Sequence, residues 1–100
     1  MKELLKQLIQ AAPTADNGER KAAQVLLDYF HTHGIEASAD IWDQTRANVL
    51  ARLPSSGRKP ALLLAAHLDV VPADPSQWHF DPFAGIEQNG RLIGRGAVDM

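Results

Sequence analysis

An apolar run at residues 61–66, Ala-Leu-Leu-Leu-Ala-Ala, constrains the fold more than any other feature of the sequence. Its side chains are hydrophobic on both faces of an extended segment, which is typical of a central strand covered by helices on each side. Pro60 precedes the run and Pro72 follows it, so a short buried helix is the less favoured interpretation. The run therefore predicts an α/β fold built on a mixed sheet with helices on both faces.

Two helices are expected before this run. The first carries apolar residues at helical spacing and should end at Pro13; its stripe comprises Leu4, Leu5, Leu8 and Ile9. The second should begin near Asp16 or Asn17, because either side chain can cap a helix. Gly34 can adopt the left-handed conformation that ends many helices, so it is the expected stop.

The remaining elements are strands and loops. Residues 35–41 and 49–53 alternate between apolar and polar side chains, which indicates two half-exposed strands. Asn89-Gly90 is the strongest short hairpin dipeptide and predicts a hairpin over residues 86–93. The chain has 100 residues, which is enough for one domain at most.

Composition excludes several classes of function. A net charge of −2 argues against electrostatic binding of nucleic acid. The sequence contains no cysteine, so a metal would have to bind histidine and carboxylate ligands. No apolar run approaches the ~20 residues of a membrane span. We therefore expect a cytoplasmic protein that binds neither nucleic acid nor membrane.

Three residues are candidates for chemistry. His67 and Asp69 directly follow the apolar run, and ligands bind at the carboxyl ends of strands in open α/β sheets. Residues at i and i+2 of an extended segment point to the same side, so both can reach one site. Asp99 follows two glycines, Gly94 and Gly96, which allow a tight backbone geometry. Taken singly, each residue is better explained as structural: a satisfied histidine, or an aspartate on a surface turn.

The combination is more specific. The ordered set comprises residues 67–72, Trp78, residues 81–83 and residues 90–100. It resembles the metallopeptidase and amidohydrolase family of acetylornithine deacetylase, succinyl-diaminopimelate desuccinylase, aminoacylase and carboxypeptidase G. The specific part of the resemblance covers residues 61–100.

The resemblance implies a two-metal hydrolase that cleaves the amide bond of an N-acyl amino acid or small peptide. By this resemblance His67 is a ligand to one of two divalent ions, zinc first and cobalt second. Asp69 is the catalytic-site acid that orients His67, and Asp99 bridges both ions. A carboxylate suits the bridging role because each of its oxygens can bind one ion of a closely spaced pair. The parent enzyme is expected to be a homodimer.

The sequence departs from the family after Met100. Relatives continue with Lys-Gly-Gly, two glutamates that include the general base, another acidic ligand, a final histidine and a lid or dimerisation domain. The resemblance therefore implies that residues 1–100 are an N-terminal fragment of the metal-binding catalytic domain, inactive by itself and without the lid. The alternatives are a di-metal aminopeptidase on the same scaffold and a non-catalytic binding or assembly module.

Other polar and aromatic residues have structural explanations. His31 and His33 bracket the end of the second predicted helix, where cations interact favourably with the helix dipole. Trp78 is expected to anchor the long loop after Pro72 rather than to line a pocket. Arg95 could bind a substrate carboxylate or pair with a neighbouring acid, and the sequence leaves both open.

Overall fold

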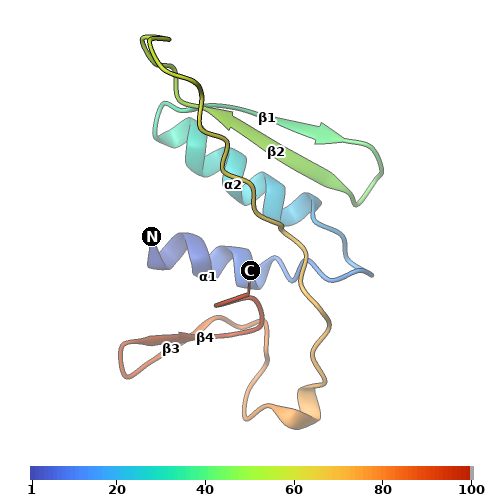
Figure 1. Ribbon diagram of the computed structural model, residues 1–100. Coiled ribbons are helices and arrows are strands. Elements are labelled where there is room, and N and C mark those ends of the chain that lie inside the picture. The colour runs from blue at the N-terminus through green and yellow to red at the C-terminus, as the bar shows by residue number, and fades with distance from the viewer. Residues whose placement is uncertain (100) are drawn as a thin grey trace.

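A computed structural model describes residues 1–99 and shows a small α/β arrangement of two helices and two antiparallel hairpins (Figure 1). The elements are α1 (Lys2–Gln10), α2 (Arg20–Thr32), β1 (Glu36–Ile41), β2 (Ala47–Arg52), the short 3-10 helix η1 (Pro75–Gln77), β3 (Ile86–Gln88) and β4 (Arg91–Ile93). The predicted α/β class is confirmed. Among residues 1–99, neither helix has the length and hydrophobicity that a membrane span requires.

The β1–β2 hairpin packs on α2, and α1 lies beside α2 (Figure 1). The strands pair with Ala39 opposite Val49, as the alternating pattern requires. Ala22 and Ala23 are buried on α2 and let the neighbouring elements approach closely. Gly34 has φ +68° at the predicted stop, so the chain leaves α2 through a left-handed residue.

The start of α2 differs from the prediction. The helix begins at Arg20, and neither Asp16 nor Asn17 caps it. Asn17 instead donates its side-chain amide to the carbonyl of Ala12, while the backbone N–H groups of Asn17 and Gly18 bond to the carbonyl of Thr14. These bonds form a separate turn, which delays the helix by several residues. Polar residues that can cap a helix can equally stabilise a turn, and here the turn is the outcome.

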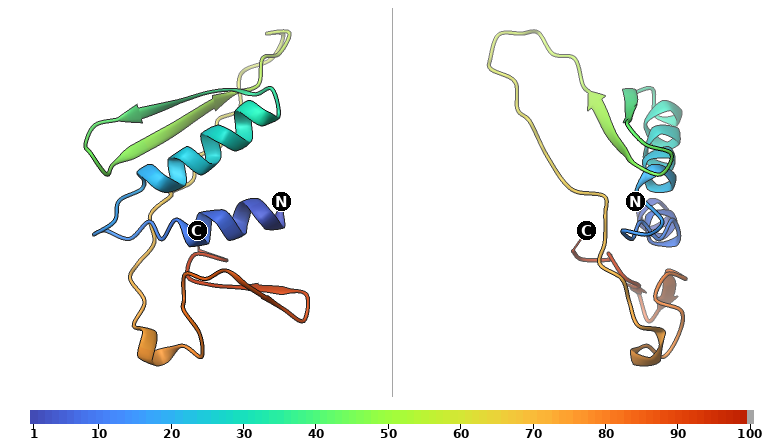
Figure 2. Two further views of the ribbon diagram at one scale, coloured as in Figure 1. Left: turned by 180° about the vertical axis from the view of Figure 1, so that it is seen from behind. Right: turned by 90° about the vertical axis from the view of Figure 1, so that its right-hand side faces the viewer.

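The apolar run at residues 61–66, called the apolar segment below, is not a strand. Leu62, Leu63 and Leu64 are 84%, 85% and 83% exposed. The segment crosses the molecule as an extended chain that stands apart from β2 (Figure 2). A strand needs a partner backbone, and among residues 1–99 none pairs with it. The predicted mixed sheet with helices on both faces is therefore not formed by the described residues, whose two sheets are two-stranded and antiparallel.

The hairpin prediction near the C-terminal end is confirmed. β3 pairs with β4 in an antiparallel register that places Ile86 opposite Ile93. Asn89 and Gly90 have φ +52° and +75°, as a type I′ turn requires at both central positions. The hairpin lies against α1, where Lys2 forms an ion pair with Glu87. The C-terminal part of the chain is thereby held close to the N-terminal helix (Figure 1).

Gly18 should be the glycine least tolerant of substitution. It has φ +72°, and an added Cβ would lie 2.2 Å from the carbonyl oxygen of Thr45. Gly57 has a similar φ of +69° but open space around it, so it is a matched control for backbone strain alone. We expect Gly57→Ala to cost about 1 kcal/mol of unfolding free energy and Gly18→Ala clearly more. Urea unfolding measures both, and equal midpoints for the two variants would contradict the close approach.

Candidate functional site

The site lies where the apolar segment ends against the connection between α1 and α2. The backbone N–H of Val70 donates to the carbonyl of Pro13 at 3.0 Å, and both residues are buried. The loop after β4 packs on the same point, because a Cβ added at Gly96 would lie 2.8 Å from Val70 Cγ1. With φ +86°, Gly96 combines a left-handed backbone with this close approach. Val70 therefore fixes two distant segments beside each other, one carrying His67 and the other Asp99.

The three predicted site residues are brought together. His67 Nδ1 donates to the backbone carbonyl of Asp69 at 2.8 Å and lies 3.3 Å from Asp69 Oδ1. His67 Nε2 lies 3.2 Å from Asp99 Oδ1, although 32 residues separate the two in sequence. Their side chains remain open to solvent, with exposed fractions of 51% for His67, 62% for Asp69 and 94% for Asp99. The imidazole of His67 thus lies between the two aspartates, with Nδ1 beside Asp69 and Nε2 beside Asp99.

The surroundings of His67 stabilise its protonated form. The hydrogen bond to the Asp69 carbonyl is the largest cause that raises the pKa of His67, and the hydrogen bond to Asp99 and the charges of both carboxylates add to it. Partial desolvation acts in the opposite direction. The protonated imidazole is therefore held by acceptors on both sides.

The donor set fits one part of a zinc-type site. Zinc binds imidazole nitrogen and carboxylate oxygen at about 2.0 to 2.2 Å, so two such ligands of one ion lie roughly 3 to 3.5 Å apart. The 3.2 Å between His67 Nε2 and Asp99 Oδ1 falls in that range. Among the described residues, however, no group of three or more histidine, cysteine, aspartate or glutamate side chains is arranged to hold an ion. His67 and Asp99 therefore suit a shared metal but do not complete its coordination.

A partly buried ion pair beside the site was not anticipated. Glu19 is 8% exposed and accepts a hydrogen bond from Arg46 Nη1. It lines a groove of about 780 Å³ between β2 and the apolar segment, together with His67 and Asp69. Glu19 was not among the predicted site residues. No local pattern could have revealed the pair, since 27 residues separate its partners.

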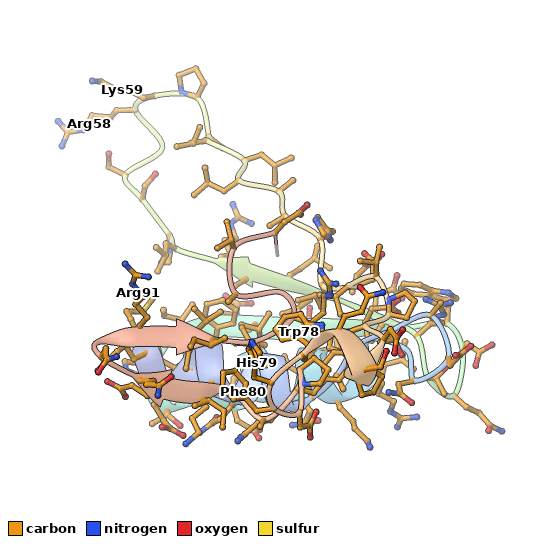
Figure 3. The ribbon with its side chains drawn as sticks, turned by 90° about the horizontal axis from the view of Figure 1, so that it is seen from below. Arg58, Lys59, Trp78, His79, Phe80 and Arg91 are labelled. Atoms are coloured by element: carbon orange, nitrogen blue, oxygen red, sulfur yellow. The ribbon has the colours of Figure 1, made fainter. Side chains whose placement is uncertain are left out.

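The other polar and aromatic residues have structural partners. The Arg95 guanidinium lies 5.6 Å from the centre of the Trp78 ring, so an aromatic side chain is one of its partners. The two expected roles of Arg95, binding a substrate carboxylate and pairing with an acid, stay predictions. His31 and His33 face the backbone carbonyls of Ala37 and Tyr29 at 3.2 and 2.8 Å. Figure 3 shows Trp78 with His79 and Phe80 on the loop that contains η1.

Comparison with known proteins identifies relatives of this chain. A family model described as Peptidase family M20/M25/M40 matches residues 63–100. A succinyl-diaminopimelate desuccinylase from Methylobacterium nodulans is 37% identical over 93 residues, which cover 88% of this chain and 23% of the relative. An acetylornithine deacetylase from Aliivibrio salmonicida is 33% identical over 105 residues, which cover 99% of this chain and 27% of the relative.

A shorter match is more similar. A succinyl-diaminopimelate desuccinylase from Methylobacterium sp. is 56% identical over 54 residues, which cover 53% of this chain and 13% of the relative. Across these three relatives the chain spans between 13% and 27% of their length. The site residues His67, Asp69 and Asp99 all lie within the part matched by the family model.

The raised pKa of His67 gives a test of the geometry. NMR titration of the metal-free chain should place the pKa of His67 above its ordinary 6.5. Protonation of His67 therefore stabilises the folded state, and this contribution is complete below pH 6.5. It is lost as the pH rises through the raised pKa that His67 has in the folded state. Asp99→Asn should move the pKa of His67 down towards 6.5, because one charged acceptor is removed. Asp16→Asn, an exposed carboxylate outside the site, is the control; an equal effect of both variants would contradict the His67–Asp99 contact.

Proposed function

Because this chain belongs to the M20/M25/M40 family of peptidases, we propose that it forms the N-terminal part of the metal-binding catalytic domain of an amide hydrolase. The proposed substrate is an N-acyl amino acid or small peptide, since the names of its relatives describe the removal of a succinyl or acetyl group. The observation that carries the proposal is the convergence of His67, Asp69 and Asp99 at one point within the matched segment.

In this proposal His67 and Asp99 hold metal, and Asp69 positions His67. The hydrogen bond from Nδ1 to the Asp69 carbonyl fixes the imidazole tautomer, which leaves the lone pair of Nε2 directed at the side of Asp99. Asp99 supplies a carboxylate that can contact two ions at once. A pair of divalent ions, zinc or cobalt, would activate a water molecule and polarise the scissile carbonyl when bound.

The described ligands are too few for activity on their own. Catalytic zinc sites use three protein ligands, and the described part of the chain offers two at this point. The chain aligns with only 23% and 27% of the length of these two relatives. This supports the proposal that further ligands and the general base come from a longer protein. The mixed sheet and the homodimer expected for that protein remain proposals with it.

A hybrid enzyme tests the proposed function. Residues 1–100 would replace the matching segment of the Aliivibrio salmonicida acetylornithine deacetylase, to which 99% of the chain aligns. We expect the hybrid to hydrolyse an N-acetyl amino acid in the presence of zinc or cobalt. His67→Ala should reduce the rate by at least about 100-fold, because losing a metal ligand costs at least as much as losing that ligand's outer hydrogen-bond partner. His33→Ala, at the residue that follows α2, should not change the rate.

The isolated 100-residue chain is the companion measurement. It should not hydrolyse the same substrate above background, with or without zinc, because its site is incomplete. A folded hybrid whose rate is unaffected by His67→Ala would contradict the assignment of His67. Turnover by the isolated chain that is lost on His67→Ala would contradict the incompleteness of the site.

A further inference from the structure

The loop at residues 94–97, called the glycine loop below, leads directly to Asp99. A Cβ added at its first glycine would lie 2.7 Å from Ile9 Cγ2 of α1, so the backbone packs closely on that helix. Arg95 stands between the two glycines of the loop, and its backbone N–H donates to the carbonyl of Pro82 at 2.8 Å. Because Arg95 lies only four residues before Asp99, any restraint on Arg95 limits where Asp99 can lie.

The side chain of Arg95 lies over the ring of Trp78. The guanidinium carbon is 5.6 Å from the ring centre, within the ~6 Å at which an aromatic ring attracts a cation. Arg95 Nε is buried and forms no hydrogen bond with an acceptor among residues 1–99. A buried donor without a hydrogen bond costs free energy, and the attraction between the ring and the cation offsets part of that cost.

The position of Trp78 is set by the short helix η1. The backbone N–H of Trp78 donates to the carbonyl of Pro75 at 3.1 Å. The side chain of Asp74 accepts hydrogen bonds from the backbone N–H and the hydroxyl of Ser76, at 2.9 and 2.8 Å. These local bonds hold the turn that carries the indole ring, so the ring is a fixed platform for the guanidinium.

We propose that Arg95 is a positioning residue for Asp99. Its contact with the Trp78 ring fixes the glycine loop, so that Asp99 Oδ1 stays 3.2 Å from His67 Nε2. The two glycines allow close approach of the backbone but have no side chain that could anchor the loop, and Arg95 supplies one. The purpose of the spacing, which is to let both residues bind one ion, rests on the proposed function, whereas the contact itself does not.

Nuclear Overhauser effects (NOEs) between the His67 ring and the Cβ protons of Asp99 test the inference in the full 100-residue chain without metal. Arg95→Met keeps an aliphatic stem but removes the cation, and Trp78→Leu keeps apolar bulk but removes the ring. Each variant should lose the NOE. Trp78→Phe keeps an aromatic face for the guanidinium and should retain it.

Two variants are matched controls. Arg91 on β4 is a cation that Figure 3 shows apart from Trp78, and Phe80 is a half-buried ring on the same loop as Trp78. Arg91→Met and Phe80→Leu should leave the NOE unchanged, and NOEs across the β3–β4 hairpin report that each variant stays folded. Retention of the NOE in a folded Arg95→Met chain would overturn the proposal, as would its loss in either control or its absence from the unaltered chain.

The hybrid enzyme separates this inference from the proposed function. Arg95→Met in the hybrid should raise the dissociation constant for zinc about tenfold, as for other residues that position metal ligands, and should lower kcat while KM is unchanged. A raised KM with unchanged kcat would assign Arg95 to a substrate carboxylate and overturn the positioning role. A hybrid that neither binds zinc nor hydrolyses substrate would contradict the proposed function, and the NOE series alone would then decide the role of Arg95.

Discussion

The packing around Val70 is the contact on which the arrangement of the site depends. Its backbone bonds to Pro13 in the α1–α2 connection, and its side chain meets Gly96 in the loop after β4. Three parts of the chain that are far apart in sequence therefore meet at one buried residue. The position of Asp99 beside His67 follows from this contact. His67 lies three residues before Val70, and Asp99 lies three residues after Gly96.

The local elements could be predicted from local patterns. The Asn89-Gly90 turn and the Gly34 stop each depend on backbone preferences of the residues themselves, and both were confirmed. The start of α2 was placed too early, because Asn17 can stabilise a turn as well as a cap. The side chain of Asn17 can form either hydrogen bond, and the sequence alone does not show which of the two is more stable.

Long-range features were harder to predict. The apolar composition of residues 61–66 correctly indicates extended chain, but the strand assignment needs a partner that the described residues do not provide. The Glu19–Arg46 pair is a contact across 27 residues with no periodic signal. The convergence of His67, Asp69 and Asp99 was suggested by family resemblance, since the spacing of these residues alone favoured structural roles. Chemistry-bearing residues could thus be named from sequence, whereas the contacts that position them could not.

The tautomer of neutral His67 decides whether the imidazole can bind an ion beside Asp99. Long-range ¹H–¹⁵N NMR correlation in the metal-free chain, at a pH above the raised pKa of His67, reports which ring nitrogen carries the proton. We expect the proton on Nδ1, held by the carbonyl of Asp69, with Nε2 left as the nitrogen for metal. A proton on Nε2, donated to Asp99, would contradict it, because the nitrogen beside the second ligand would then not be available to an ion.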